Sequence, residues 1–410
     1  MQGRLHAPSP IARDSTMANP PPLKTLGIYD DAAVFGGHEQ MSCCGIEALA
    51  AETDLSLVCY YYEGNRRLAE RLQDIASRHG NVRLRSLNFC SRKFQGIRGR
   101  FAGKRIRSLA DRFKLHRVNA LLALQGDIEL SSLGILAARR LAIPAVSYIP
   151  VPHTLKTMQA KLGGLRDPFN VWLFKKPDSF ITISEGMKSL LRERGARQPI
   201  EVVLNGFDPA KTEPRDSAEA RARLQLPADK RLVGMVGRVE FKQKRQDLLL
   251  ESFAENYARM EDVHLVFVGS GPDRDRLQQR ARDLGVHDAT SFIAWTDGLS
   301  DVYAALDLLC LPSRFEGVPL VMLEAMSVNL PVVASARDGM QEFLPPEWLF
   351  PPGDRQACAD RLLAVLASPS PELLQQNRER ALREFSMAAF NRDFVAATRR
   401  LTGLASAAGA

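Results

Sequence analysis

Short apolar runs of strand length alternate with helical patterns along almost the whole chain. The apolar runs in the first half predict strands at residues 25–29, 55–61, 82–87, 120–124, 145–149, 180–183 and 201–204. Those in the second half predict strands at residues 231–236, 264–268, 290–293, 308–311 and 331–334. Strands separated by helices are typical of parallel α/β layers, so we expect two parallel sheets.

The chain divides between these two sets of strands. Its 410 residues exceed what one hydrophobic core usually supports. Residues 208–230 are polar and contain three prolines, which predicts a linker with a short helix. We therefore expect domains at 24–208 and 209–385, and then a helix at 386–404 that crosses back to the first domain, because the helical pattern of the tail is interrupted there. Residues 1–23, which lack the apolar centre of a signal peptide, are expected to be a disordered leader.

The cysteines and the apolar runs indicate where the protein resides. The six cysteines show neither paired nor metal-like spacing, and Cys59 and Cys310 lie in apolar, strand-like runs. We interpret all six as free thiols of a reducing cytoplasm. No apolar run approaches the ~18 residues that a membrane-spanning helix requires. The expected location is therefore cytoplasmic.

The net charge of +8 is unevenly spread and gathers in residues 92–117. This stretch holds ten Lys or Arg side chains against a single acid, Asp111, and apolar residues are interleaved with them. The pattern is typical of a basic amphipathic segment attracted to an anionic membrane surface, here the inner face of the plasma membrane. Nucleic acid is the competing partner, but no recognised binding motif accompanies the charge, so we expect no nucleic acid. A solvated helix face is the third interpretation.

The segment 315–335 contains a carboxylate within an apolar helix. Glu324 is surrounded by apolar residues on every side of the predicted helix, and a helix that is apolar all round is normally buried. Because a carboxylate is almost never buried without a partner, Glu324 is a candidate functional residue. Glu316 lies eight residues earlier, where the loop meets the helix. The alternative is a structural cap or an ion pair within the core.

Other unusual polar residues follow directly after predicted strands, at the edge where parallel sheets bind ligands. Arg238 and Lys244 follow the strand at 231–236 and would suit a diphosphate, although a surface charge cluster is the alternative. Gly36 and Gly37 follow the first strand and open a helix. They would let a backbone approach a phosphate or a reacting sugar.

Three weaker features lie at the same edge. His153 follows the strand at 145–149 in a loop bounded by prolines, although a lone histidine is more often a packing or surface residue. The glycine turn at 269–271 is as consistent with a structural turn as with an anion site. Asp273 and Asp275 resemble a metal-binding D-x-D pair, but acids in a first helical turn complement the helix dipole anyway, so no metal site is expected.

Two carboxylates also suggest a glycoside hydrolase. Retaining glycosidases hold their carboxyl groups ~5 Å apart, whereas eight helical residues span ~12 Å. A hydrolytic pair formed by Glu316 and Glu324 is therefore disfavoured. Two glutamates that bind hydroxyls at opposite ends of an extended ligand fit this spacing better.

The motif FEGVPLVMLEAM, at residues 315–326, resembles the E-x7-E element of the retaining family 4 glycosyltransferases. The resemblance extends over residues 24–400. It implies the α/β GT-B fold, in which an N-terminal Rossmann-like acceptor domain faces a C-terminal Rossmann-like domain for a nucleotide-sugar donor. It also implies a nucleotide-diphosphate sugar as co-substrate, with no cofactor and no metal.

The resemblance assigns a role to each candidate. Glu316 would bind donor-sugar hydroxyls, Glu324 the ribose hydroxyls, and His153 would lie near the donor sugar. Arg238 and Lys244 would hold the diphosphate. The group expected to act in catalysis is Arg238, Lys244, Glu316 and His153. Backbone amides for the sugar and phosphates would come from Gly317, Val318, Pro319 and Leu320, and the glycine loop of Gly36 and Gly37 would lie beside the phosphate.

The sequence departs from the family pattern at two positions. The helix after Glu324 usually ends in Cys-Gly, and Ser327-Val328-Asn329 stands there instead. The Gly-Gly of the following loop is replaced by Asp338-Gly339-Met340, while Glu342 matches the acid that follows. Because asparagine can adopt a left-handed helix cap, the first departure is compatible with the fold.

The resemblance implies sugar transfer with retention of configuration to a lipid-linked or saccharide acceptor, in envelope polysaccharide biosynthesis. The leaving diphosphate, neutralised by Arg238 and Lys244, would itself deprotonate the acceptor hydroxyl. A non-catalytic scaffold subunit with the same fold is one alternative, and a sugar-nucleotide epimerase is another. The basic stretch 92–117 makes a lipid-linked acceptor plausible.

Overall fold

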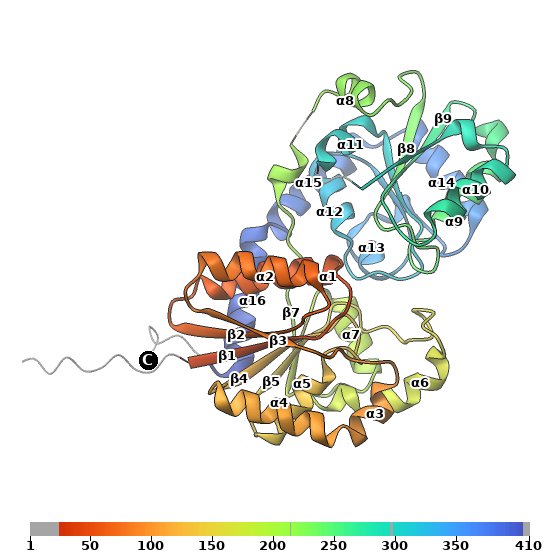
Figure 1. The fold of residues 1–410 in the computed structure, drawn as a ribbon. Coiled ribbons are helices and arrows are strands. Elements are labelled where there is room, and N and C mark those ends of the chain that lie inside the picture. The colour runs from red at the N-terminus through yellow and green to blue at the C-terminus, as the bar shows by residue number, and fades with distance from the viewer. Residues whose placement is uncertain (1–23, 214, 296–297, 405–410) are drawn as a thin grey trace, which may run out of the picture.

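The computed structural model describes residues 24–213, 215–295 and 298–404. Figure 1 shows two α/β domains, each with a parallel sheet between layers of helices. The leader expected at residues 1–23 lies outside the described residues. Within the described ranges, no helix is both long enough and apolar enough to cross a membrane.

The N-terminal sheet has seven strands in the order β3-β2-β1-β4-β5-β6-β7, paired in parallel. Its strands are β1 (Lys24–Asp30), β2 (Leu55–Tyr62), β3 (Val82–Leu87), β4 (Ala120–Leu124), β5 (Ala145–Tyr148), β6 (Ser179–Thr182) and β7 (Ile200–Val202). Its helices are α1 (Gly37–Ala50), α2 (Arg66–Arg78), α3 (Gln95–Phe101), α4 (Gly103–Leu115), α5 (Ser132–Arg140), α6 (Gly163–Asn170) and α7 (Glu185–Glu193). The strand order reverses between β1 and β4, and ligands of such sheets usually bind at this point.

The C-terminal sheet has six strands in the order β10-β9-β8-β11-β12-β13, also paired in parallel. Its strands are β8 (Arg231–Val236), β9 (Val263–Val268), β10 (Thr290–Ile293), β11 (Leu308–Leu311), β12 (Val332–Ser335) and β13 (Leu349–Phe350). Its helices are α8 (Ser217–Arg223), α9 (Gln246–Glu255), α10 (Arg274–Asp283), α11 (Leu299–Ala305), α12 (Leu320–Ser327), α13 (Asp338–Phe343), α14 (Arg355–Ala367) and α15 (Pro371–Glu384). The sequence does not predict β13, because a strand of two residues carries no periodic signal.

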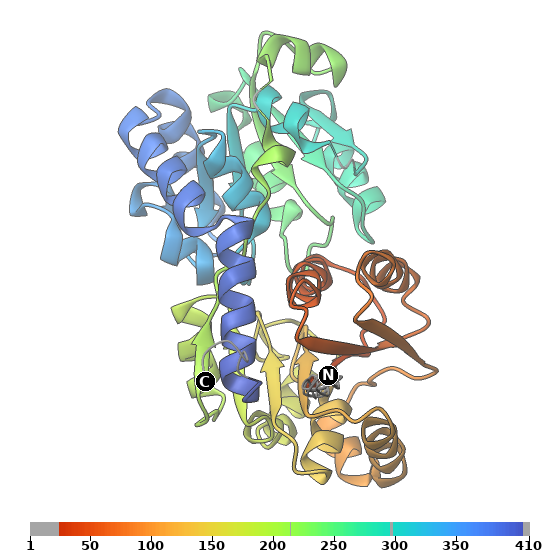
Figure 2. The same cartoon turned by 90° about the vertical axis from the view of Figure 1, so that its left-hand side faces the viewer.

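Two stretches of backbone connect the domains and lie side by side. The N–H of Phe207 donates to the carbonyl of Phe385 at 2.9 Å, and Phe207 forms a β-bridge with Ser386. Ser386 then caps α16 (Met387–Thr402), which Figure 2 shows running from the C-terminal domain along the N-terminal domain. There α16 packs against α1, β4, β5 and β6. The two Rossmann-like sheets and the returning helix confirm the predicted fold class.

The basic stretch 92–117 forms α3 and α4, which meet at Ala102. Some of its apolar side chains face solvent: Phe101 is 83% exposed and Leu115 is 75% exposed. In the described part of the chain, none of its ten Lys and Arg side chains takes part in an ion pair. The stretch is therefore an exposed cationic surface with apolar side chains at its edge.

Candidate active site

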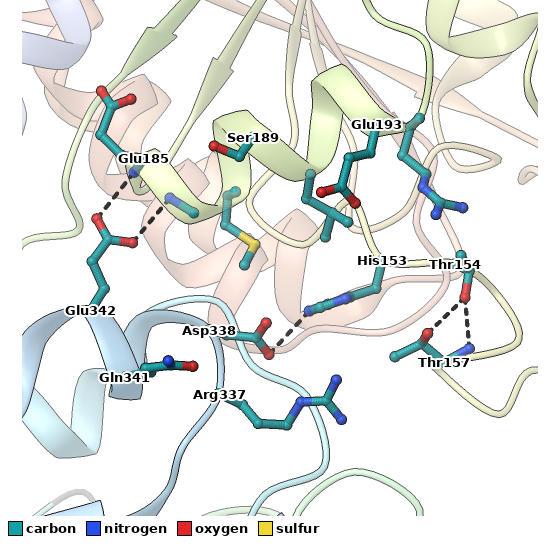
Figure 3. A pocket seen from close by; sticks show the side chains of 14 residues that line it. His153, Thr154, Thr157, Glu185, Ser189, Glu193, Arg337, Asp338, Gln341 and Glu342 are labelled. Atoms are coloured by element: carbon teal, nitrogen blue, oxygen red, sulfur yellow. Dashed lines mark hydrogen bonds and ion pairs between the residues drawn. The ribbon is translucent and has the colours of Figure 1, made fainter. Parts of the chain in front are cut away.

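The candidate site lies between the two domains, beyond the carboxyl ends of their strands. A cavity of about 650 Å³ is lined on one side by the loop after β5 and by α7. On the other side it is lined by α13, which follows β12 (Figure 3). Both sheets thus direct their ligand-binding edges toward one cavity.

A series of polar contacts runs from one domain to the other through this region. The Lys244 Nζ donates to Glu316 Oε1 at 2.6 Å. The backbone N–H of Glu316 donates to Asp338 Oδ2 at 2.8 Å, and His153 Nε2 lies 3.1 Å from the same oxygen, as an ion-pair contact. The structure therefore brings Lys244, Glu316 and His153 together, with Asp338 linking the last two.

The loop before α12 lies close to both its own domain and the facing one. A Cβ on Gly339 would lie 2.4 Å from the carbonyl oxygen of Gly317, which accepts the N–H of Gly339 at 3.0 Å. A Cβ on Gly317 would lie 2.6 Å from Ile183 Cδ1 of the N-terminal domain. The Asn205 amide nitrogen also donates to the carbonyl of Val318 at 3.1 Å. These close approaches need glycine and fix the loop that carries Glu316.

One expected role on this loop is wrong for a chemical reason. Pro319 was expected to offer a backbone amide, but proline has no N–H. Its carbonyl instead accepts the N–H of Met322 at 3.1 Å, and the residue forms the N-cap of α12. Donors to a ligand on this loop can come only from Gly317, Val318 and Leu320.

The expectation that Glu324 is buried on every side is also wrong. One face of α12, formed by residues 320, 321, 324 and 328, is only half-buried, while the opposite face is fully buried. The Tyr303 hydroxyl of α11 donates to Glu324 Oε2 at 2.6 Å. Burial, together with the Glu324 charge, raises the pKa of Tyr303 well above its usual value. The carboxylate is therefore oriented by a neutral tyrosine rather than enclosed in the core.

Arg238 is not joined to this series of contacts. Its side chain is 56% exposed, and its Nε lies 3.9 Å from Glu240 Oε2. Its carbonyl accepts a hydrogen bond from the Gln246 side chain at 2.9 Å, which fixes the backbone of the loop after β8. The guanidinium itself is largely exposed and only loosely paired.

Gly36 and Gly37 lie at the start of α1, where Glu39 Oε2 accepts the N–H of Gly36 at 2.7 Å. Both glycines are exposed. The next side chain, His38, was not singled out from the sequence; its ring centroid lies 5.5 Å from that of Tyr148. Both His38 ring nitrogens are buried without a hydrogen-bond partner, and burial lowers the pKa of the imidazole.

Two family models cover most of the chain. The model described as glycosyl transferases group 1 matches residues 216–384, and that described as glycosyl transferase 4-like domain matches residues 40–206. The chain belongs to this glycosyltransferase family. The predicted relationship to family 4 is thereby confirmed.

Curated relatives of this glycosyltransferase align over part of their length. The lipopolysaccharide core biosynthesis glycosyltransferase LpsE of Rhizobium meliloti is 30% identical over 185 residues, which is 45% of this chain and 52% of that protein. The D-inositol 3-phosphate glycosyltransferase of Mycolicibacterium gilvum is 32% identical over 222 residues, 50% of this chain and 49% of that protein. The chain thus spans about half the length of the curated relatives it matches.

Solved structures resemble the glycosyltransferase over nearly the whole chain. Anabaena HepE, solved in complex with UDP-glucose, has a TM-score of 0.73 at 18% identity, and the match covers 92% of this chain and 99% of HepE. WaaG, a glycosyltransferase involved in lipopolysaccharide biosynthesis, has a TM-score of 0.67 at 16% identity, covering 92% of this chain and 100% of WaaG. At these identities the likeness shows the fold alone, which is GT-B.

Two residues of the glycosyltransferase have a larger part in the site than their sequence context indicates. Asp338 departs from the family's Gly-Gly, yet it contacts both Glu316 and His153. Glu342 accepts the backbone N–H groups of Glu185 and Gly186, each at 3.1 Å, at the N-terminus of α7 in the facing domain (Figure 3). An acid in a short helix after a strand is a weak signal, and only the facing domain reveals these contacts.

Proposed function

We propose that this chain is a retaining glycosyltransferase that moves a sugar from a nucleotide-diphosphate sugar to a lipid-linked or saccharide acceptor. The observation that carries the proposal is the series of contacts from Lys244 through Glu316 and Asp338 to His153. It connects a cation and a carboxylate of the C-terminal domain to Asp338 and His153, which line the cavity between the two domains. Relatives named for lipopolysaccharide core biosynthesis support an envelope glycan as the product.

The donor would bind along the C-terminal wall of the cavity. HepE, solved with UDP-glucose, supports a nucleotide sugar as the donor of a protein with this fold. Glu316 would accept hydrogen bonds from sugar hydroxyls and Glu324 from the ribose hydroxyls. Arg238 and Lys244 would hold the diphosphate, with the Gly36-Gly37 loop beside it.

A diphosphate would exchange partners with the residues already in place. Its oxygens carry more negative charge than one carboxylate, so Lys244 Nζ would turn from Glu316 toward them. Glu316 would then be free to accept hydrogen bonds from the sugar. Arg238, whose exposed side chain is only loosely paired, would add a second positive group.

In the transfer step the bond between the anomeric carbon and the phosphate oxygen breaks. The acceptor oxygen forms its bond to the same face of that carbon, and its proton passes to the leaving phosphate. No protein base is required by this scheme, and the positive charge that stabilises the leaving group comes from Lys244 and Arg238. His153, held by Asp338, would lie beside the sugar.

Replacing Lys244 tests the proposal directly. We expect Lys244→Ala to lower kcat/KM for sugar transfer by about 10²–10³-fold, because charge stabilisation of the leaving diphosphate is lost. Transfer is measured by product mass, using a panel of nucleotide sugars with lipid and saccharide acceptors. Lys242→Ala, two residues away, is the matched control and should retain the wild-type rate.

The other outcomes separate the alternatives. Wild-type turnover in Lys244→Ala contradicts the assigned site. Nucleotide binding without transfer to any acceptor in the panel would indicate a scaffold subunit, and an isomerised nucleotide sugar would indicate an epimerase. Transfer appears as a new product mass, epimerisation is detected by chromatographic separation of the isomeric nucleotide sugars, and nucleotide binding is detected by a thermal shift.

The cationic surface of α3 and α4 supports a peripheral position on the cytoplasmic face of an anionic membrane. Its ten Lys and Arg side chains have no ion-pair partner within the described part of the chain, and Phe101 and Leu115 are exposed beside them. Basic side chains near such a surface each contribute about 1 kcal/mol. This position would bring the cavity close to a lipid-linked acceptor.

A further inference from the structure

One cation beside the cavity has no role in the proposed transfer. Arg194 follows the last turn of α7 as its C-cap. Its Nε is buried without a hydrogen-bond partner, and no carboxylate of the described residues forms an ion pair with it. Other arginines near it are satisfied: Arg192 donates to the carbonyls of Ala196 and Gln198 at 3.2 and 2.8 Å. A buried N–H left without an acceptor is costly, and an anionic ligand beside the guanidinium would remove that cost.

Arg194 lies where two cavities meet. It lines the 650 Å³ cavity between the domains and a second one of about 200 Å³ within the N-terminal domain, and both include His153. Asp167, also in the smaller cavity, already has hydrogen-bond partners: its carboxylate accepts the N–H groups of Leu155 and Lys156 at 2.8 and 3.1 Å. Glu193 lines both cavities and could accept hydrogen bonds from hydroxyl groups. Arg194 is therefore the cation available to a ligand at this junction.

The smaller cavity has a largely apolar wall that leads to the surface. This wall is formed by Ile128, Leu155, Val171 and Phe174. Val171 is 43% exposed, and it continues an exposed apolar edge along α6 that includes Leu162, Leu165 and Phe169. The next residue, Trp172, donates from Nε1 to the carbonyl of Gly96 in α3, so this edge adjoins the cationic surface.

We propose that Arg194 binds the phosphate of a lipid-linked acceptor. The glycan end of that acceptor would extend past His153 into the larger cavity, and the lipid would leave through the apolar wall toward the edge of α6. Glu193 would bind hydroxyls of the acceptor glycan. The identification of the ligand as a sugar acceptor rests on the proposed function. The phosphate site itself can be tested without sugar transfer.

The test measures binding of dodecyl phosphate below its micelle concentration, by calorimetry at moderate salt. We expect Arg194→Gln to weaken binding at least about tenfold, because a charge-assisted hydrogen bond to phosphate is lost. Arg197→Gln is the matched control, since Arg197 is exposed and lies outside both cavities. Arg194→Lys should give an intermediate affinity, because it keeps the charge but not the planar fork. UDP affinity and Tm, measured on each variant, report on folding.

Each of three results would overturn a different part of the inference. Equal binding of dodecyl phosphate by the wild type and by folded Arg194→Gln excludes Arg194 as the phosphate ligand. Glucose 1-phosphate binding as tightly as dodecyl phosphate excludes the lipid part, because it lacks the apolar chain. Dodecyl maltoside binding that depends equally on Arg194 excludes a phosphate-specific site. If dodecyl phosphate binding depends on Arg194 while no sugar transfer is found, the proposed function fails and the anion site stands.

Discussion

The two domains differ in how the polar groups of the candidate site and its surroundings are satisfied. On the C-terminal side, Lys244 is paired with Glu316, and Glu324 accepts a hydrogen bond from Tyr303. On the N-terminal side, buried atoms of Arg194, His38 and Asp30 have no partner in the described structure. The C-terminal side is held in place by its own contacts, whereas the N-terminal side retains binding capacity.

The cationic surface offers the largest effect on the N-terminal side. We expect the triple change of Arg98, Lys104 and Arg107 to Gln to weaken binding to vesicles with 30% phosphatidylserine by about 3 kcal/mol, or roughly 150-fold, since each basic side chain contributes about 1 kcal/mol. Sedimentation with the vesicles measures this. Changing Arg276, Arg280 and Arg282 of α10 to Gln is the control and should have little effect. If the variant of Arg98, Lys104 and Arg107 bound the vesicles with wild-type affinity, the cationic surface would be a solvated helix face and not a membrane-binding one.

The contact between Glu342 and α7 links the two walls, and removing its charge should have an intermediate effect. Glu342→Gln would weaken two hydrogen bonds to the N-terminus of α7 and its interaction with the helix dipole, at a cost of about 2 kcal/mol. We expect a wider distribution of interdomain distances, measured between spin labels on the two domains. Glu347→Gln is a suitable control, because Glu347 is exposed and outside the cavity. An unchanged distribution would mean that the connecting backbone alone sets the domain arrangement.

Removing the charge of Asp30 should have the smallest effect, and it should stabilise the protein rather than weaken an interaction. Burial, followed by the charge of Glu39, raises the pKa of the Asp30 carboxyl well above its usual value, and one of its oxygens has no partner. The folded protein therefore holds this proton more tightly than the unfolded chain, whose carboxyl has a pKa of about 3.9. The free energy of unfolding therefore falls as the pH rises from about 3.9 through the raised pKa of Asp30. Above the raised pKa, the full destabilisation by the buried charge is present.

Asp30→Asn should therefore stabilise the protein at pH 7 by on the order of 1 kcal/mol. Its amide oxygen can still accept the N–H of Ala32, which Asp30 accepts at 2.9 Å. The gain should vanish below about pH 4, where Asp30 is protonated in both states. Denaturant unfolding at several pH values measures it. Asp338→Asn on the other wall should instead destabilise, since Asp338 is paired with His153; a gain there would break the contrast between the walls.

The sequence predicts most of the fold and part of the site because some signals are local. Strand-length apolar runs locate most strands, and the residues that follow them include Lys244, Glu316 and His153. The half-buried face of α12 could not be predicted, because it depends on which elements, chiefly α15, pack against the helix. Glu342 contacts residues more than 150 positions away, and nothing near it in sequence indicates an interdomain contact. Arg194 was missed for a similar reason: its lack of a partner is a property of the surrounding structure.

The return of α16 has a consequence for the order in which the protein folds on the ribosome. Arg399 pairs with Glu52 and Asp54, residues separated from it by 347 and 345 positions. A Cβ on Gly45 of α1 would lie 2.5 Å from the Phe394 ring of α16. The helix α16 therefore packs tightly on α1, at whose start Gly36 and Gly37 lie. The N-terminal domain, although translated first, stays incomplete until the C-terminal domain has emerged. Such distant contacts slow folding, and they ensure that the N-terminal side of the cavity is completed only after the C-terminal domain exists.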